Sequence, residues 1–165
     1  MARIRNRIAG APSLKYVINM SDQTVLNNTW TKILQWSPDF ERELEFDERN
    51  AKFTCDQEGI YYFNAHIAFK ADSEGTPITE TTNATYQEGV AIYKNGSLVH
   101  KTGTNTEHTY VGKGVSISAP LQLVRGDYVE IYGFVRDDDN PGDTEYAIPE
   151  GADGIFCWLS IVRLF

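Results

Sequence analysis

The chain has 165 residues, of which 41% are hydrophobic, 23% charged and 12% aromatic, and this ordinary composition excludes wholesale disorder. A chain of this length can form one domain with a self-sufficient core. Its formal net charge of −8 argues against general binding of nucleic acid, because a phosphate backbone attracts concentrated positive charge.

Residues 1–13 are predicted to form a basic arm that precedes a single domain at residues 14–165. Arg3, Arg5 and Arg7 lie in this arm with no acidic residue among them, whereas the rest of the chain is acidic. Both a frayed terminus and an arm that docks onto an acidic partner fit this pattern. The arm lacks the apolar centre of a secretory signal, so we expect no export by that route. No stretch approaches the roughly 20 apolar residues of a membrane-spanning helix.

Alternating apolar and polar residues predict strands through the rest of the chain, separated by clusters of Gly, Asn, Asp and Pro. Residues 37–46 have a weak helical pattern without a well-placed capping box, which favours a loop followed by a short strand. Many short antiparallel strands without crossover helices indicate an all-β sandwich or jelly roll. The predicted strands are Leu14–Asn19, Trp30–Trp36, Leu44–Phe46, Lys52–Cys55, Gly59–Lys70, Gly89–Lys94, Leu98–Thr102, Gly114–Leu123, Tyr128–Arg136 and Gly154–Phe165.

The strand predicted at Gly59–Lys70 has two different faces. One face is apolar and suits a core. The other mixes apolar and polar side chains, as a packed and hydrogen-bonded subunit contact does. The first face holds Tyr61, Phe63, Ile67 and Phe69, and the second holds Ile60, Tyr62, Asn64 and His66.

Two turns fix local strand pairing. Asn95 and Gly96 lie between VAIYK and SLVHK and supply the two positive φ values of a type I′ hairpin. Gly126 and Asp127 occupy the reversal in LQLVRGDYVEI, as Gly and Asp commonly do in turns. With Arg125 they form the tripeptide that integrin-class receptors recognise, but the turn alone accounts for their presence.

An acidic stretch, RDDDNPGDTEYAIPEGAD, follows the predicted strand Tyr128–Arg136. Asp137, Asp138, Asp139 and Asp143 offer the hard oxygen ligands that calcium prefers. The stretch does not match an EF-hand loop, because Pro141 occupies a ligand position. A solvated loop is the favoured interpretation, and a calcium site is the alternative.

The closing segment GIFCWLSIVRLF is apolar on both faces of a strand. One face can enter the sandwich core, and the other needs a cover, because a large exposed apolar patch on a monomer promotes aggregation. Self-association supplies that cover, and a roof formed by the protein's own loops is the alternative. The predicted contact residues are Ile60, Tyr62, His66, Phe156, Trp158, Ile161 and Phe165.

Neither the cysteines nor the histidines form a catalytic or metal-binding motif. Cys55 and Cys157 are predicted to be buried thiols outside any disulfide, with a single bridge between them as the alternative. His66, His100 and His108 show no two-histidine ligand spacing and no recognisable triad. No pair of carboxylates stands out either. We therefore expect no catalytic residues and no enzyme activity.

The run FDERNAKFTCDQEGIYYF resembles the signature of the C1q-like domain family, relatives of tumour necrosis factor. Phe46, Phe53, Gly59, Tyr61 and Phe63 reproduce its aromatic and glycine spacing. VAIYKNGSLV and LQLVRGDYVEI are similar to its hairpins, and GIFCWLSIVRLF to its closing strand. The resemblance covers roughly residues 14–165 and implies a ten-stranded jelly roll that assembles as a homotrimer. Some family members bind calcium.

The chain also departs from the family pattern. Glu41 stands where Asn or Asp is usual, Ala65 where an aromatic residue is usual and Trp158 about where Gly is usual. The insertion at residues 71–87 is long, and no Gly-X-Y repeat of a collagen-like stalk is present. These departures indicate a distant member of phage or bacterial type.

Two functional hypotheses follow from the sequence. The first is a trimeric structural protein on the surface of a virus or phage particle, a capsid decoration or tail component docked by the basic arm. The second is an extracellular recognition module whose loops at residues 71–86 and 137–153 bind a receptor or glycan, with avidity from three copies. One particle-surface trimer could do both.

Overall fold

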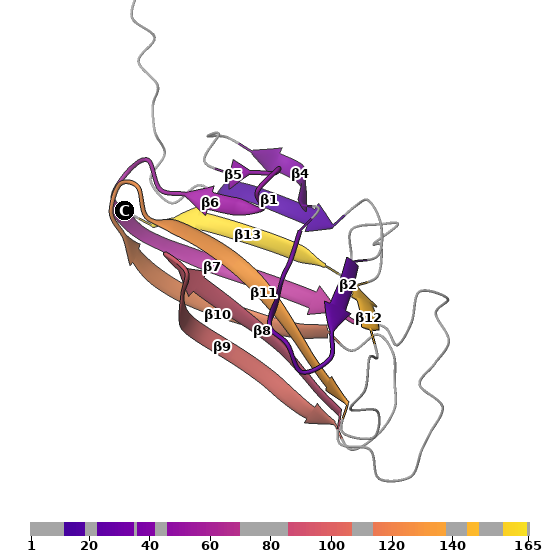
Figure 1. The fold of residues 1–165 in the computed structure, drawn as a ribbon. Coiled ribbons are helices and arrows are strands. Elements are labelled where there is room, and N and C mark those ends of the chain that lie inside the picture. Colours follow the sequence, from indigo (N-terminus) through magenta and orange to yellow (C-terminus); the bar gives the residue numbers. More distant parts are fainter. Residues whose placement is uncertain are drawn as a thin grey trace, which may run out of the picture.

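The computed structural model describes residues 12–18, 23–34, 36–41, 46–69, 86–106, 114–137, 145–148 and 157–164. Over these ranges the chain forms strands and no helix (Figure 1). The described residues accordingly include no helix that is long and apolar enough to cross a membrane. The predicted all-β class is confirmed.

A five-stranded antiparallel sheet, here called the first sheet, forms one layer of a sandwich (Figure 1). Each strand pairs antiparallel with its neighbours. In spatial order the strands are β10 (Gly114–Leu123), β7 (Gly59–Ala68), β13 (Trp158–Arg163), β1 (Pro12–Ile18) and β4 (Trp36–Glu41).

The second layer is a six-stranded sheet, here called the second sheet. Its strands in spatial order are β5 (Phe46–Asp47), β6 (Lys52–Thr54), β11 (Tyr128–Asp137), β8 (Tyr86–Lys94) and β9 (Ser97–Thr106), with β3 (Thr31–Lys32) pairing with β11 beside β6. A further two-stranded sheet joins β2 (Gln23–Leu26) to β12 (Glu145–Ile148).

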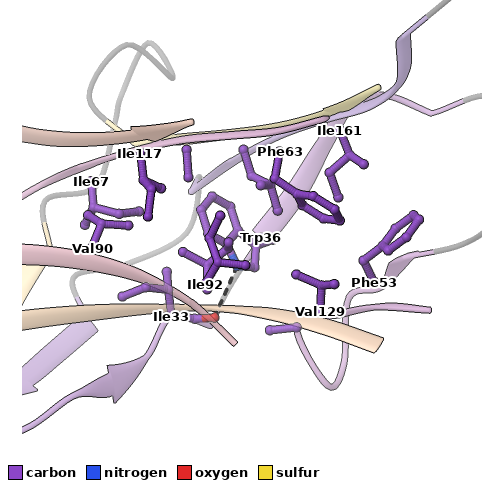
Figure 2. Close-up of a cluster of buried hydrophobic side chains, with 14 of the residues drawn as sticks. Ile33, Trp36, Phe53, Phe63, Ile67, Val90, Ile92, Ile117, Val129 and Ile161 are labelled. Carbon is purple, nitrogen blue, oxygen red and sulfur yellow. Dashed lines mark hydrogen bonds between the residues drawn. The ribbon is translucent and has the colours of Figure 1, made fainter. Parts of the chain in front are cut away.

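The core lies between the two main sheets and is filled by alternate residues of the facing strands (Figure 2). In β7 the inward side chains include Tyr61, Phe63 and Ile67, all fully buried. The ring of Phe53 from β6 meets the edge of Phe63 at a centroid distance of 5.6 Å and also contacts Tyr61 at 5.2 Å. Each such side chain contributes about 1.5–3 kcal/mol by its removal from water.

The strand predicted at Trp30–Trp36 is wrong, because this segment changes sheets. Thr31 and Lys32 pair with β11 of the second sheet, whereas Trp36 begins β4 and pairs with β1 of the first sheet. The Trp36 Nε1–H donates to the carbonyl of Ile33 at 3.2 Å and secures the corner (Figure 2). Residues 37–41, expected to be a loop, continue β4 as a strand.

The other strands agree more closely with the sequence. The prediction Gly114–Leu123 matches β10 residue for residue, and Tyr128–Arg136 ends one residue before β11 does. The described residues contain thirteen strands rather than the ten that the resemblance implies. Short segments such as β2 and β3 account for part of the difference, and β12 lies within the stretch expected to be an acidic loop.

The predicted hairpin and the predicted thiols are confirmed. Asn95 and Gly96 have φ values of 52° and 76° between β8 and β9, as a type I′ turn requires. Cys55 and Cys157 are buried and form no disulfide. Burial raises the pKa of the Cys157 thiol to about 12.

Candidate functional site

Three neighbouring strands of the first sheet, β10, β7 and β13, present an outer face without a formal charge. Side chains on this face alternate with the core residues of the same strands. The uncharged face, as we call it, consists of Ile60, Tyr62, Asn64 and His66 of β7, Ser116, Ser118, Pro120 and Gln122 of β10, and Trp158, Ser160 and Val162 of β13.

His66 lies at the centre of one row of this face. The strand register aligns it with Ser116 on one side and Trp158 on the other. Its Nδ1 lies 2.8 Å from the Ser116 hydroxyl and hydrogen-bonds it. Its ring is nearly parallel to that of Trp158, with an interplanar angle of 18° and 6.3 Å between the ring centroids. A Cβ at Gly114 would lie 2.2 Å from His66 Nε2, so glycine is required for the ring to lie there. Burial lowers the pKa of His66.

The next two rows are polar and then apolar. The Ser118 hydroxyl hydrogen-bonds Asn64 Oδ1 of the neighbouring strand. One row further, Tyr62 lies between Pro120 and Val162 in the register. The Ser116–His66 and Ser118–Asn64 pairs thus bond within the face, so a partner could cover these pairs without breaking their hydrogen bonds.

Most of the described contact residues predicted from sequence lie on this face. Ile60, Tyr62, His66 and Trp158 are half-buried and point outward. Ile161 does not, because it is 0% exposed and packs in the core (Figure 2). It lies an odd number of residues from Trp158, and successive side chains of a strand point to opposite faces.

Two further predicted contact residues, Phe156 and Phe165, lie outside the described residues, as do Arg3, Arg5 and Arg7 of the arm. Asp138, Asp139 and Asp143 of the acidic stretch also lie outside them. Asp137 ends β11, and only its backbone is described. In the described part of the chain, no group of three or more His, Cys, Asp or Glu side chains could hold a metal ion. The arm and the calcium site remain predictions.

The turn at Arg125–Asp127 links the first sheet to the second and is structural, as predicted. Gly126 has a φ of 90°. The Asp127 carboxylate is bound by Lys94 Nζ at 2.8 Å, Asn95 Nδ2 at 2.7 Å and the Val124 backbone N–H at 2.9 Å. These hydrogen bonds, led by that of Lys94, lower the pKa of Asp127 to about 2. With the residue only 8% exposed, its carboxylate is not available to a receptor in this conformation.

A shallow hollow of about 460 Å³ lies beside this turn. Its charged lining residues already contact protein groups. Asp47 accepts hydrogen bonds from the backbone N–H and the side chain of Asn50, which lower its pKa. Arg125 pairs with Asp56 at 3.3 Å. The hollow therefore gathers no set of groups that suggests catalysis. The complete lining is Phe46, Asp47, Thr54, Cys55, Asp56, Arg125 and Gly126.

The outer face of the second sheet is aromatic and carries ion pairs. The ring centroids of Tyr93 and Tyr132 lie 4.1 Å apart. Lys52 Nζ lies 5.0 Å from the centre of the Tyr128 ring. We call these three tyrosines the tyrosine face. The sequence analysis did not identify it, although Tyr128 and Tyr132 share one face of a predicted strand.

Comparison with known proteins supports the fold. No family model matches the chain. Its structure is similar to the globular domain of zebrafish complement 1qA, with a TM-score of 0.56 and 14% identity over 92% of this chain and 98% of that one. It is similar to Eiger TNF from S. frugiperda, with a TM-score of 0.59 and 11% identity over 96% and 94%. It is also similar to murine APRIL, with a TM-score of 0.57 and 13% identity over 93% and 100%. The chain thus has a C1q- and TNF-like jelly-roll fold.

Proposed function

We propose that this C1q- and TNF-like jelly roll is a non-enzymatic structural protein that assembles as a homotrimer through the uncharged face. The observation that carries the proposal is the absence of formal charge across the outer residues of β7, β10 and β13. The chain as a whole is 23% charged, so solvent exposure alone does not account for such a face. Depletion of charged residues is typical of the core of a protein interface.

The chemistry of the uncharged face also fits burial. Tyr62 and Trp158 are of the residue types enriched at interfaces. The Ser118–Asn64 and Ser116–His66 hydrogen bonds satisfy polar groups within one protomer. A second copy therefore needs to supply mainly shape and apolar contact. The likeness to C1q and TNF domains supports three copies around a common axis.

A pair of substitutions tests this assembly. Ser118→Asp places a carboxylate on the uncharged face, whereas Thr54→Asp places one on the outer side of the second sheet. An unpaired buried charge costs several kcal/mol, so Ser118→Asp should give monomers in light scattering at micromolar concentration, and Thr54→Asp should remain trimeric. A wild-type protein that is monomeric under these conditions contradicts the proposal.

The finer proposal is that the trimer is a virion or phage surface component, a capsid decoration or tail protein docked by the arm. The arm's positive charge on an acidic chain supports it. A chain that lacks residues 1–11, and a full-length chain with Arg3, Arg5 and Arg7 changed to Gln, should both form trimers. If capsid and tail genes neighbour the gene of this protein, the particles that they encode are the binding partner to test. Neither variant should co-sediment with these particles. Particle binding by the truncated chain would refute docking through the arm.

A second candidate is a receptor- or glycan-binding module, which the tyrosine face favours. Tyrosine provides rigid, amphipathic contact area, and aromatic residues are enriched among interface hot spots. Under this alternative the protein acts outside the cell rather than on a particle. A glycan array with the wild-type protein and with Tyr132→Ala tests it. Loss of a bound glycan in the variant supports the module, whereas identical array profiles argue against this face as the binding surface.

A further inference from the structure

Among the described residues, His66 is the only imidazole on the uncharged face. Strand β7 places it between β10 and β13, with its Nδ1 bound to Ser116 and its ring against Trp158. Its Nε2 lies over the backbone of Gly114, where even a methyl group would collide. The ring is therefore held in one position. A partner that covers the face must cover this imidazole as well.

Among the residues that the structure describes, the strands around His66 place no carboxylate beside it. Serines and Gly114 face it from β10, Trp158 and Ser160 from β13, and Asn64 and Tyr62 from its own strand. On β1 the backbone register places Val17 opposite Trp158 and Lys15 opposite Ser160. On the inner side, Cys157 is neutral at ordinary pH because burial raises the pKa of its thiol to about 12. A protonated His66 would thus find no carboxylate on the strands packed around it.

We propose that His66 makes assembly of the trimer reversible in mild acid, so that the protein is trimeric at neutral pH and dissociates when this imidazole takes up a proton. The inference rests on the proposed function, since it concerns the regulation of the same face. It adds that the contact is not permanent. One buried and unpaired charge would appear in each protomer, and the symmetry brings three of them to one assembly.

The direction of the pH dependence follows from burial. In the separate protomer, partial burial already lowers the pKa of His66 from its ordinary value of 6.5, because desolvation penalises the charged form. A partner would bury the ring further and lower the pKa again. The separated protomers therefore bind the proton more tightly, and lowering the pH through their imidazole pKa favours dissociation. With three sites, the association constant should fall by up to about a thousandfold per pH unit in that range.

The test compares the masses of three proteins between pH 7.5 and pH 5.0 by light scattering, with circular dichroism to verify that they stay folded. Wild type should change from trimer to folded monomer. His66→Gln keeps a polar side chain of similar reach but cannot gain a charge, so it should remain trimeric at pH 5.0. His100→Gln, which alters an exposed histidine on β9, should behave as wild type does.

The possible results separate the two proposals. If wild type is monomeric at pH 7.5, the proposal of a homotrimer is itself refuted. A wild-type trimer that persists at pH 5.0 overturns only the role of His66, as does a His66→Gln variant that dissociates like wild type. If His66→Gln fails to assemble at all, nuclear magnetic resonance of the wild-type imidazole decides. Its pKa should fall when the concentration is raised through the assembly range, and a pKa that is independent of concentration refutes the inference.

Discussion

The two sheets present different outer faces. On β7, β10 and β13 of the first sheet the outward side chains carry no formal charge, and His66 and Asn64 each hydrogen-bond a serine of β10. On the second sheet, Lys32 pairs with Glu130 at 2.5 Å, and aromatic rings pack among charged groups. Both sheets have the same alternating pattern and share one core. Alternation therefore locates the core, and the chemistry of the outward residues distinguishes a face suited to another protein from a face suited to water.

The largest expected effect separates the inner face from the outer face within a single strand. Phe63 and Tyr62 are adjacent in β7, but Phe63 is fully buried in the core and Tyr62 points outward. Phe63→Ala should lower the free energy of unfolding by about 4 kcal/mol, because it leaves a cavity beside Phe53. Urea denaturation measures this loss.

Tyr62→Ala is the matched control. It should cost the isolated protomer less than about 1 kcal/mol, as most surface substitutions do. It should nevertheless weaken assembly, measured by light scattering. If Tyr62→Ala unfolds the protomer as severely as Phe63→Ala does, the division of β7 into a folding face and an assembly face is wrong.

A smaller effect is expected at the turn that joins the two sheets. Asp127→Asn keeps the shape of the side chain but removes the charge that Lys94 and Asn95 bind. The free energy of unfolding should fall by about 2 kcal/mol at pH 7, because hydrogen bonds to charged groups stabilise a fold more than neutral ones do. The folded-state pKa of Asp127 is about 2, below the ordinary aspartate pKa of 3.8. The advantage of wild type should thus be complete above about pH 4 and disappear as the pH falls to about 2.

Thermal unfolding of both proteins across this pH range tests the sign. The difference between wild type and variant should shrink on acidification. A difference that stays constant from pH 7 to pH 2 would mean that the charge of Asp127 does not stabilise the turn.

The smallest effect concerns the charged side of the comparison. Glu130→Gln breaks the pair with Lys32 and should cost less than about 1 kcal/mol, because partly exposed ion pairs contribute little. The cost should vanish in 1 M salt, which shortens the range of electrostatic interactions to about 3 Å. Glu48→Gln, at an exposed position of the β5–β6 turn, should change nothing. A larger loss in Glu130→Gln that is insensitive to salt would indicate that packing, not charge, determines this face.

The sequence predicted well those strands whose apolar and polar residues alternate strictly and that are joined by tight turns. Apolar and polar residues alternate strictly in β10, and the Asn95–Gly96 turn fixes the β8–β9 hairpin. The predicted ends of β10 and the predicted position of this turn therefore match the structure. The segment from Trp30 to Trp36 looked like one strand because periodicity does not reveal a change of sheet. Its corner depends on a hydrogen bond of Trp36 and on tertiary pairing, neither of which leaves a local pattern.

The candidate site was predictable only in part. β7 distinguishes its faces in composition, so Tyr62 and His66 were assigned to the correct side. β13 is apolar on both faces, and the assignment of Ile161 to the outside failed because hydrophobicity alone does not tell which face is inward. The contact of His66 with Gly114 joins residues far apart in sequence, and only the pairing of β7 with β10 brings them together.

The state of the two cysteines has a practical consequence. Both are buried and neither is in a disulfide, and a thiol with a pKa of about 12, like that of Cys157, holds almost no reactive thiolate at neutral pH. Alkylating reagents should therefore not react with either thiol in the native protein. A cysteine introduced at Thr54, on the outer side of the second sheet, would then be the one reactive site for a fluorophore or a spin label, and it lies away from the uncharged face. Distances between such labels on neighbouring subunits would report the geometry of the assembly directly.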